Sequence, residues 1–464
     1  MTELPAERPA SLDPEGHRIS LHPARVKGEW NTRRVYFQTF LVLTLLILPW
    51  IKINGYPAVL IDLPHRRFAL FGLTFWAHDT PLLFLVMGTF AFSAALLTAL
   101  FGRVWCGWAC PQTVFIERVF RQVEFLIEGH HLEQKALDAS AWGLRKIKLK
   151  TLKWSLFTAI SLIITHSLLA YFVGVDQLYE MMQASPQQAW PVFLIMAFTT
   201  SILLFNFGWF REQFCIIMCP YGKIQSLLTD EDTLSVAYDN IRGEPRGEGG
   251  DCVACFKCVS VCPTGIDIRR GSQQLECINC TACIDVCNEV MKKVKKPQGL
   301  IRYASEVEIL KGVRKSIPSN FKKMRIFLYT CLLLFCVSGL VWTISNRRDL
   351  RIVALRASES PYQLVHDDHG NEKIINHFKI DLQNQNFETF EMKLLKSDNE
   401  EFEFVTPQST FDLRGGQRHV LDVFVKFDPK VNRHNVQIAF VGTSDNGTIK
   451  ESVELGLISP QGAE

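Results

Sequence analysis

The sequence predicts a polytopic α-helical membrane protein with a cysteine-rich insertion and a small C-terminal β-sandwich. Three observations lead to this fold class: long uncharged apolar stretches, a dense group of cysteines before the last stretch, and alternating strand patterns after it. Of the 464 residues, 48% are hydrophobic, which is apolar-rich for a soluble protein. The net charge of +3 gives no indication of nucleic-acid binding.

Five stretches contain no Asp, Glu, Lys or Arg, and each is about long enough to cross a hydrocarbon core of roughly 30 Å as a helix. They are residues 35–51, 80–102, 154–175, 181–210 and 326–346. Buried helices of a large soluble core are the alternative interpretation. Five such stretches in one chain favour transmembrane helices.

The distribution of Lys and Arg orients these helices. Segments 1–34, 103–153 and 211–325 hold 6, 9 and 18 of them, whereas the loops 52–79 and 176–180 hold 3 and 0. The positive-inside rule therefore places the N-terminal segment 1–34, segment 103–153 and region 211–325 in the cytoplasm, and residues 350–464 outside. The first apolar stretch lacks a small-residue cleavage site, which favours an anchor over a signal peptide.

Two Cys-x3-Cys-Pro motifs follow apolar stretches in the membrane region 35–210. "VWCGWACPQT" supplies Cys106 and Cys110, and "FCIIMCPYGK" supplies Cys215 and Cys219. Spacing of four predicts that each pair lies on one helix face. Because the two halves resemble a parallel repeat, we expect all four thiols to meet near the inner membrane surface.

Soft thiolates favour Cu(I) over Cu(II), so a copper site with these four cysteines is one interpretation. There are two functional alternatives: a dithiol/disulfide relay, and a third metal cluster that passes electrons to quinone. The structural alternative is that these cysteines are simply small, buried hydrophobic side chains. His166, inside the third stretch, is a weak candidate for a further ligand. Cys331 and Cys336, five residues apart in the last stretch, are interpreted as packing residues.

Two cysteine runs in region 211–325 have the C-x2-C-x2-C-x3-C spacing of bacterial two-cluster ferredoxins, and they define a ferredoxin-like domain at 245–295. Three cysteines of each run bind one 4Fe–4S cluster, and the fourth binds the other. One cluster is therefore assigned Cys252, Cys255, Cys258 and Cys287, and the second Cys277, Cys280, Cys283 and Cys262. Pro263 follows the first run, but Asn288 stands where the second would have proline. Zinc is the competing metal for such spacing.

Residues 350–464 contain alternating apolar and polar runs separated by turn signals, which predict a small all-β sandwich. No cysteine follows Cys336, so this domain has no disulfide.

The combination of paired Cys-x3-Cys-Pro motifs, a two-cluster ferredoxin insertion and a C-terminal sandwich resembles the cytochrome c oxidase accessory protein family (CcoG, also called FixG or RdxA). The resemblance covers nearly the whole chain. It implies a bacterial inner-membrane protein with a periplasmic immunoglobulin-like domain, acting as a cupric reductase in assembly of cbb3-type cytochrome c oxidase. It also implies copper as substrate at Cys106, Cys110, Cys215 and Cys219, and two 4Fe–4S clusters at the eight cysteines named above.

The alternative function is a quinol-oxidising membrane electron conduit of the kind used in nitrate and nitrous-oxide respiration. The expected partners are the lipid bilayer, copper-delivery or oxidase-assembly proteins and a cytoplasmic electron donor. The identity of the donor, the direction of Cu(I) release and the oligomeric state, including a homodimer, stay open.

Overall fold

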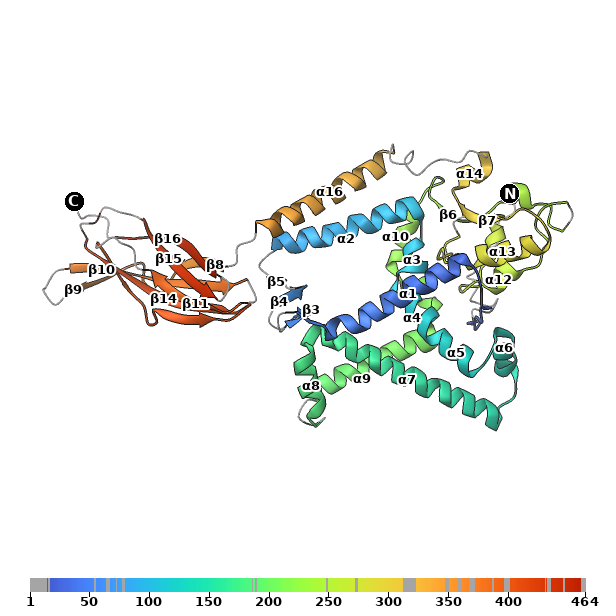
Figure 1. Cartoon of the computed structure of the whole chain (residues 1–464), viewed down its shortest axis with the longest axis horizontal. Coiled ribbons are helices and arrows are strands. Elements are labelled where there is room, and N and C mark those ends of the chain that lie inside the picture. Colours follow the sequence, from blue (N-terminus) through green and yellow to red (C-terminus); the bar gives the residue numbers. More distant parts are fainter. Residues whose placement is uncertain are drawn as a thin grey trace. The chain divides into compact units, whose positions relative to one another are not determined.

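The chain forms two compact units in the computed structural model (Figure 1). Unit 1 contains residues 1–50 and 81–340, and unit 2 contains residues 51–80 and 341–464. The described residues leave out 1–14, 16, 54–55, 64–66, 72, 77–79, 186, 188–189, 248, 272–273, 312–322, 347–349, 358–359, 367–371, 386–387, 396–400, 430, 432–434, 445–446 and 460–464.

Four helices in the described part of the chain are long and apolar enough to cross a membrane. They are α2 (Thr80–Phe101), α7 (Leu144–Val173), α9 (Trp190–Leu204) with its π-helical continuation η3 (Phe205–Phe210), and α16 (Met324–Ser345). These helices cover most of four of the five predicted stretches. The first stretch lies in α1 (Glu29–Ile47) and the 3-10 turn Leu48–Trp50, and α1 does not meet the same criterion. The count of five transmembrane helices stays a prediction.

Segment 103–153 is helical almost throughout. It forms α3 (Val104–Trp108), α4 (Pro111–Phe115), the π-helix η2 (Ile116–Phe120), α5 (Arg121–Ile127), α6 (His131–Ala139) and the basic start of α7. Phe120 is fully buried, with its ring 4.9 Å from that of Phe157 and 5.2 Å from that of Phe207. The apolar face of this helical segment packs on α7 and η3.

The two halves of the membrane region exchange equivalent contacts. Gln112 and Tyr221 each stand two residues after the second cysteine of their motif. Gln112 donates a hydrogen bond to Asn206 of the second half (3.0 Å), and Tyr221 is hydrogen-bonded to Thr98 of the first (2.9 Å). The parallel repeat itself stays a prediction.

The insertion begins with α10 (Pro220–Leu228) and continues through β6 (Ser235–Tyr238), α11 (Asn240–Gly243), α12 (Lys257–Ser260), the 3-10 turn η5 (Ile268–Arg270), α13 (Ala282–Lys293), β7 (Ile301–Ala304) and α14 (Glu306–Lys311). Because β6 pairs antiparallel with β7, the ferredoxin body extends beyond the predicted 245–295 at both ends.

The segment 241–251 is rich in Gly and charged residues, a composition typical of a loose linker, but it folds onto the ferredoxin body. Arg242 forms an ion pair with Asp251 (2.5 Å) and donates to the carbonyl of Gln298 (3.1 Å). Charged side chains thus fix a sequence whose composition alone indicated flexibility.

The described part of the N-terminal segment crosses the ferredoxin body. The amide of Ala24 donates to the carbonyl of Ser260 (2.9 Å), and that of Asn31 donates to the Asp285 carboxylate (2.7 Å). At the start of α1, Arg34 reaches the carbonyl of Cys280 (2.8 Å). Residues 24–34 therefore bind a domain that lies far downstream in the chain.

Helices α2 and α16 approach closely where glycines face larger side chains. A Cβ on Gly88 would lie 2.9 Å from the sulfur of Cys336, and one on Gly339 would lie 3.1 Å from Leu85. Cys336 is buried at this contact, as its interpretation as a packing residue requires, whereas Cys331 is exposed on unit 1.

Unit 2 holds the predicted all-β sandwich. One sheet has the order β12–β14–β10–β8, with β9 pairing the first part of β10, and the other has the order β13–β11–β15–β16. The strands are β8 (Leu350–Arg356), β9 (Gln363–His366), β10 (Glu372–Asn384), β11 (Phe390–Leu395), β12 (Phe402–Val405), β13 (Thr410–Leu413), β14 (Arg418–Phe427), β15 (Asn435–Ser444) and β16 (Gly447–Gly456).

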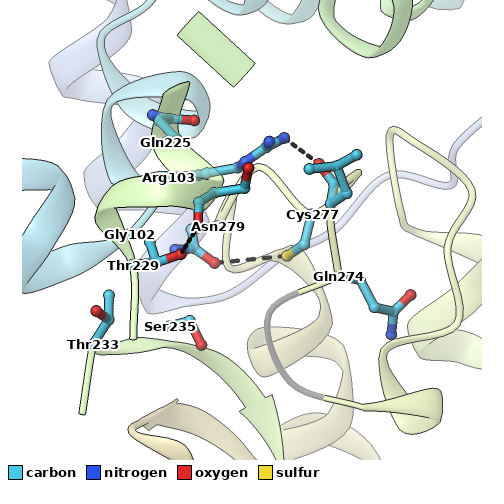
Figure 2. A pocket seen from close by; sticks show the side chains of 11 residues that line it. Gly102, Arg103, Gln225, Thr229, Thr233, Ser235, Gln274, Cys277 and Asn279 are labelled. Carbon is cyan, nitrogen blue, oxygen red and sulfur yellow. Dashed lines mark hydrogen bonds between the residues drawn. The ribbon is translucent and has the colours of Figure 1, made fainter. Parts of the chain in front are cut away.

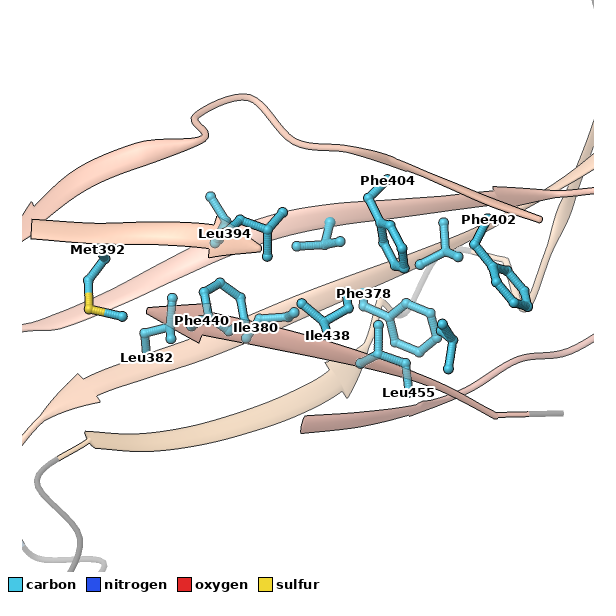
Figure 3. Packing of buried hydrophobic residues seen from close by; sticks show 14 of the residues in the cluster. Phe378, Ile380, Leu382, Met392, Leu394, Phe402, Phe404, Ile438, Phe440 and Leu455 are labelled. Atoms are coloured by element: carbon cyan, nitrogen blue, oxygen red, sulfur yellow. The ribbon is translucent and has the colours of Figure 1, made fainter. Parts of the chain in front are cut away.

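Alternate residues of both sheets form the core of the sandwich. Figure 3 shows Ile380 and Leu382 of one sheet packed with Met392, Ile438 and Phe440 of the other. The two sheets pack in this way because apolar residues recur at every second position of the sequence, which places one apolar face of each strand inward.

Unit 2 also contains strands from the loop after α1. The strands β1 (Lys52–Ile53) and β2 (Tyr56–Pro57) form one pair. A meander follows, made of β3 (Val59–Asp62), β4 (Arg67–Leu70) and β5 (Leu73–Trp76).

Candidate iron–sulfur and thiol site

Both cysteine runs of the insertion have the same unusual backbone. Ala254 and Phe256 of the first run have φ of 51° and 54°, and Asn279 and Thr281 occupy the same two places in the second run with φ of 52° and 66°. A residue other than glycine in this left-handed region is strained and persists only where its surroundings require it. Four such residues at equivalent positions form two matching loops, which turn the cysteines of each run toward a common centre.

The electrostatic neighbours of the thiols cross between the two cysteine runs. Cys287 lies within electrostatic range of Cys252, Cys255 and Cys258, although it comes from the second run. Cys262, from the first run, lies near Cys280 and Cys277 of the second. Cys283 interacts with Cys258 as well as with its own set, so the two sets adjoin.

The second set encloses a small cavity. Cys262, Cys277, Cys280 and Cys283 line it, with the apolar side chains Val236, Ile266, Ile268 and Ile278. Burial raises the pKa of Cys277 and of Cys287 to about 12, so metal binding at either thiol must release a proton. Thiolates around an apolar cavity fit a 4Fe–4S cluster, in which each cysteine binds a separate iron.

The Cys-x3-Cys-Pro motifs differ from their prediction in one respect. Cys106 lies in α3, but Cys110 is the extended N-cap of α4, with φ −62° and ψ 123°. Cys215 lies in the π-helix η4 (Phe214–Met218), and Cys219 is the extended N-cap of α10. The prediction that each pair shares one helix face is wrong, because the proline after each motif starts a new helix and excludes the helical conformation from the cysteine before it.

The four thiols of these motifs nevertheless come together. Every pair among Cys106, Cys110, Cys215 and Cys219 lies within electrostatic range. Burial, together with neighbouring Cys110 and Cys219, raises the pKa of Cys106 to about 11. Within the residues that the structure describes, however, no three Cys, His, Asp or Glu side chains are close enough to hold one metal ion. This applies equally to the four motif thiols and to the eight cluster cysteines.

Gly107 brings this thiol group onto the second cysteine run. A Cβ at Gly107 would lie 2.3 Å from the carbonyl oxygen of Ile278 and 3.0 Å from the Cα of Cys280. Cys106 itself packs against the side chains around Cys280. The backbone at Gly107, in the first Cys-x3-Cys-Pro motif, therefore lies close to the backbone of the loop that carries the cluster cysteine Cys280.

A polar cavity lies beside the same junction. Figure 2 shows Arg103 and Gln225 facing Cys277 and Asn279 across it. The sulfur of Cys277 lies 3.6 Å from the carboxamide oxygen of Asn279. The sulfur of Cys106 lies 3.5 Å from the carboxamide oxygen of Gln225. Arg103 also bridges the two sides, since it donates to the carbonyls of Leu275 and Gly222.

Cys215 and Cys219 line a wider cleft. The opposite side consists of the ferredoxin body, including Phe256 and Val259 of the first run. Arg103, Lys223 and Arg270 line the cleft together with Asp267 and Glu276. The second thiol pair is therefore reachable from solvent, next to the loop that carries Cys255 and Cys258.

Sequence reasoning missed the residues that hold these parts together. Gly107, Arg103 and Gln225 have no motif signal beyond their closeness to the cysteines. His166 does not join the thiols: its Nδ1 is hydrogen-bonded to the carbonyl of Leu162 (2.7 Å), and none of its described contacts is to a cysteine.

A buried charge network lies behind the thiol group. Arg211 binds the Glu124 carboxylate with both guanidinium nitrogens (2.9 and 2.6 Å), and Lys153 lies 3.4 Å from it. Burial alone would raise the pKa of Glu124, but Arg211, Lys153 and Arg121 lower it to about 2. The carboxylate is thus charged at neutral pH and joins α5, α7 and the second motif.

Comparison with known families gives three matches. A 4Fe–4S dicluster domain model matches residues 210–249 and 245–306, and a 4Fe–4S binding domain model matches residues 83–150. A model of the IG-like fold at the C-terminal of FixG matches residues 340–460.

Curated relatives extend across the domains. Protein RdxA of Cereibacter sphaeroides is 39% identical over 304 residues, which is 62% of this chain and 62% of RdxA. Protein RdxB of the same organism is 39% identical over 307 residues, with 62% of each chain covered. Nitrogen fixation protein FixG of Rhizobium meliloti is 38% identical over 309 residues, or 62% of this chain and 57% of FixG. The chain therefore matches less than two thirds of the length of these relatives.

The apolar helices, the two sets of cluster cysteines and the 4Fe–4S matches define a membrane iron–sulfur protein with the cofactor type used for electron transfer. The immunoglobulin-like domain and the relatives make the assignment more specific. The chain is similar to the FixG/RdxA family.

Proposed function

We propose that this protein reduces Cu(II) to Cu(I) at the four thiols Cys106, Cys110, Cys215 and Cys219. The observation that carries the proposal is their gathering, from two separate motifs, directly against the loop that holds Cys280. When bound, the two 4Fe–4S clusters supply electrons one at a time, as the reduction of Cu(II) requires. Thiolate ligands favour the product, because soft sulfur binds Cu(I) better than Cu(II).

The thiols provide both selectivity and proton release. Burial raises the pKa of Cys106, so the free site holds protonated thiols, and copper competes with protons for the sulfur atoms. The cleft beside Cys215 and Cys219 is the route by which copper, or a protein that carries it, reaches the site.

The direct test replaces each motif pair by serine and measures Cu(II) reduction by purified, electron-loaded protein. Cys106/Cys110→Ser and Cys215/Cys219→Ser should each abolish reduction and lower copper binding, while iron content stays near that of the wild type. The matched control is Cys331/Cys336→Ser, which should keep most of the activity because neither residue belongs to the thiol group. If the variant with all four motif serines reduces Cu(II) at the wild-type rate, copper reduction does not occur here.

A second candidate function is a quinol-oxidising conduit in which the four thiols hold a third cluster. The match of a 4Fe–4S binding domain model to residues 83–150, which include Cys106 and Cys110, favours it. Iron content separates the two functions. We expect about eight iron and eight labile sulfide atoms per chain if only the ferredoxin body is filled, and about twelve of each with a third cluster.

The cellular role follows the family resemblance. We propose an inner-membrane location with a periplasmic C-terminal domain, and a role in delivering Cu(I) during assembly of cbb3-type oxidase. In a strain that lacks the gene, oxidase activity should fall at low copper and recover when copper is added. Unchanged oxidase activity in such a strain would argue against this role.

A further inference from the structure

The first cluster set reaches the protein surface at one cysteine. Of the eight cluster cysteines, Cys255 alone is exposed; the other seven are buried or half-buried. Cys255 lies in the left-handed turn between Ala254 and Phe256, at the start of α12. In Figure 1, α12 and α13 lie at the periphery of unit 1, beyond α3 and α4. An electron from another protein can therefore enter most directly at this cysteine.

Basic side chains stand on α12, which begins two residues after Cys255, and at the end of α13. Lys257 lies in α12, and Lys292 and Lys293 occupy the last turn of α13, the helix that carries Cys287. Lys257 is within electrostatic range of Glu289, which in turn pairs with Lys293, so α12 and α13 form one surface. Arg246 and Arg269 lie within electrostatic range of each other. With the three lysines they make five cationic groups.

An exposed aromatic ring completes this surface. Phe256 is 58% exposed, and the guanidinium of Arg269 lies 4.1 Å from its ring centre. Arg269 is itself fixed by Asp267 (2.7 Å). A rigid exposed aromatic side chain surrounded by charges is a common anchor of protein–protein contacts. The acidic groups of this surface, Glu244, Asp267 and Glu289, are each paired with one of its cations.

We propose that the surface formed by Arg246, Cys255, Phe256, Lys257, Lys292 and Lys293 docks a small acidic electron-carrier protein. One electron would pass from the carrier to the 4Fe–4S cluster that Cys252, Cys255, Cys258 and Cys287 would hold. No covalent bond is made or broken. The basic residues attract the acidic partner and orient it over Cys255. This inference concerns the electron donor of the proposed reductase. It depends on the proposed function only for the direction of electron flow, which is from the docked carrier into this protein.

The test measures binding and cluster reduction without copper. The probe is a purified acidic bacterial ferredoxin, and the variant is the double charge reversal Lys257→Glu and Lys293→Glu in the full-length protein. We expect affinity for the ferredoxin and its rate of cluster reduction to fall about tenfold or more, with a flatter dependence on salt. Reduction by the small cation methyl viologen, which needs no docking, should stay within about twofold, and cluster spectra should be unchanged.

A matched control uses the other basic region near a cluster. Arg25 and Lys27 line a cavity beside Val261 and Ala282, which flank the second cluster set. The double reversal Arg25→Glu and Lys27→Glu changes charge equally, and it should leave ferredoxin binding near the wild-type value. If this control loses binding while the α12–α13 variant does not, electrons enter at the second set and the proposal is wrong.

Anionic lipid headgroups are the other class of partner for a basic surface. The same measurements in neutral phosphatidylcholine vesicles and in vesicles with added phosphatidylglycerol separate the two. A defect that is equal in both supports a protein partner. A defect seen only with phosphatidylglycerol would overturn the proposal. Because copper is absent throughout, loss of docking is distinguishable from loss of Cu(II) reduction.

Discussion

Gly107 leaves no room for a side chain between the thiol group and the ferredoxin body. In Gly107→Ala, the new methyl group would meet the carbonyl of Ile278 at 2.3 Å and the backbone of Cys280 at 3.0 Å. Backbone atoms on both sides cannot move away as a flexible side chain could, so we expect about 1–3 kcal/mol of destabilisation. A lower thermal unfolding midpoint and an altered electron paramagnetic resonance signal of the second cluster would show it.

Gly143 provides the matched comparison for this substitution. It lies at the N-cap of α7, and a Cβ there meets nothing within 4 Å. Gly143→Ala should therefore leave both the unfolding midpoint and the cluster signal unchanged. Equal effects of the two substitutions would mean that the close approach at Gly107 has no special importance.

Glu124 joins three helical elements through one buried carboxylate. In Glu124→Gln, the side chain keeps its shape, but Arg211 and Lys153 lose their shared negative partner. Removal of one partner from a buried ion pair costs about 3–5 kcal/mol, whereas an exposed pair contributes roughly 0.5 kcal/mol. Thermal unfolding in detergent should show a large decrease for this variant and almost none for Glu289→Gln, whose pair with Lys293 is exposed.

The same carboxylate predicts a pH dependence. Folding lowers the pKa of Glu124 to about 2, so its contribution to stability is present above the ordinary pKa of a glutamate. That contribution is lost as the pH falls toward about 2. The difference in unfolding midpoint between the wild type and Glu124→Gln should therefore shrink as the pH is lowered from neutral. A difference that grows on acidification would contradict the charged, paired state of Glu124.

At the level of elements, sequence spacing predicted the cluster sets but not the break within each thiol motif. The cluster ligands could be assigned because the run length fixes how far each thiol can reach, whatever surrounds it. The conformation of Cys110 depends on Pro111, whose ring disfavours a helix at the residue before it, and here that local effect overrides helical spacing. The approach of Gly107 to Ile278 could not be predicted, since it depends on how two distant segments dock.

At the level of the whole molecule, orientation in the membrane is still a prediction from the Lys and Arg distribution. A reporter active only in the periplasm should work when fused after Gly447 and be silent when fused after Gly271. This follows from the basic character of segments 1–34, 103–153 and 211–325. The opposite pattern would place the ferredoxin body outside and remove cytoplasmic carriers as electron donors.

The contact of the N-terminal segment with the ferredoxin body has a consequence for biosynthesis. Arg34 binds the carbonyl of Cys280, a residue 246 positions later, so this partner does not exist until most of the chain has been translated. Ribosomes add roughly 5–20 residues per second, which leaves the segment without its binding surface for about ten seconds or longer. Residues 24–34 are therefore synthesised before the loop around Cys280 and are available to bind it as soon as it folds.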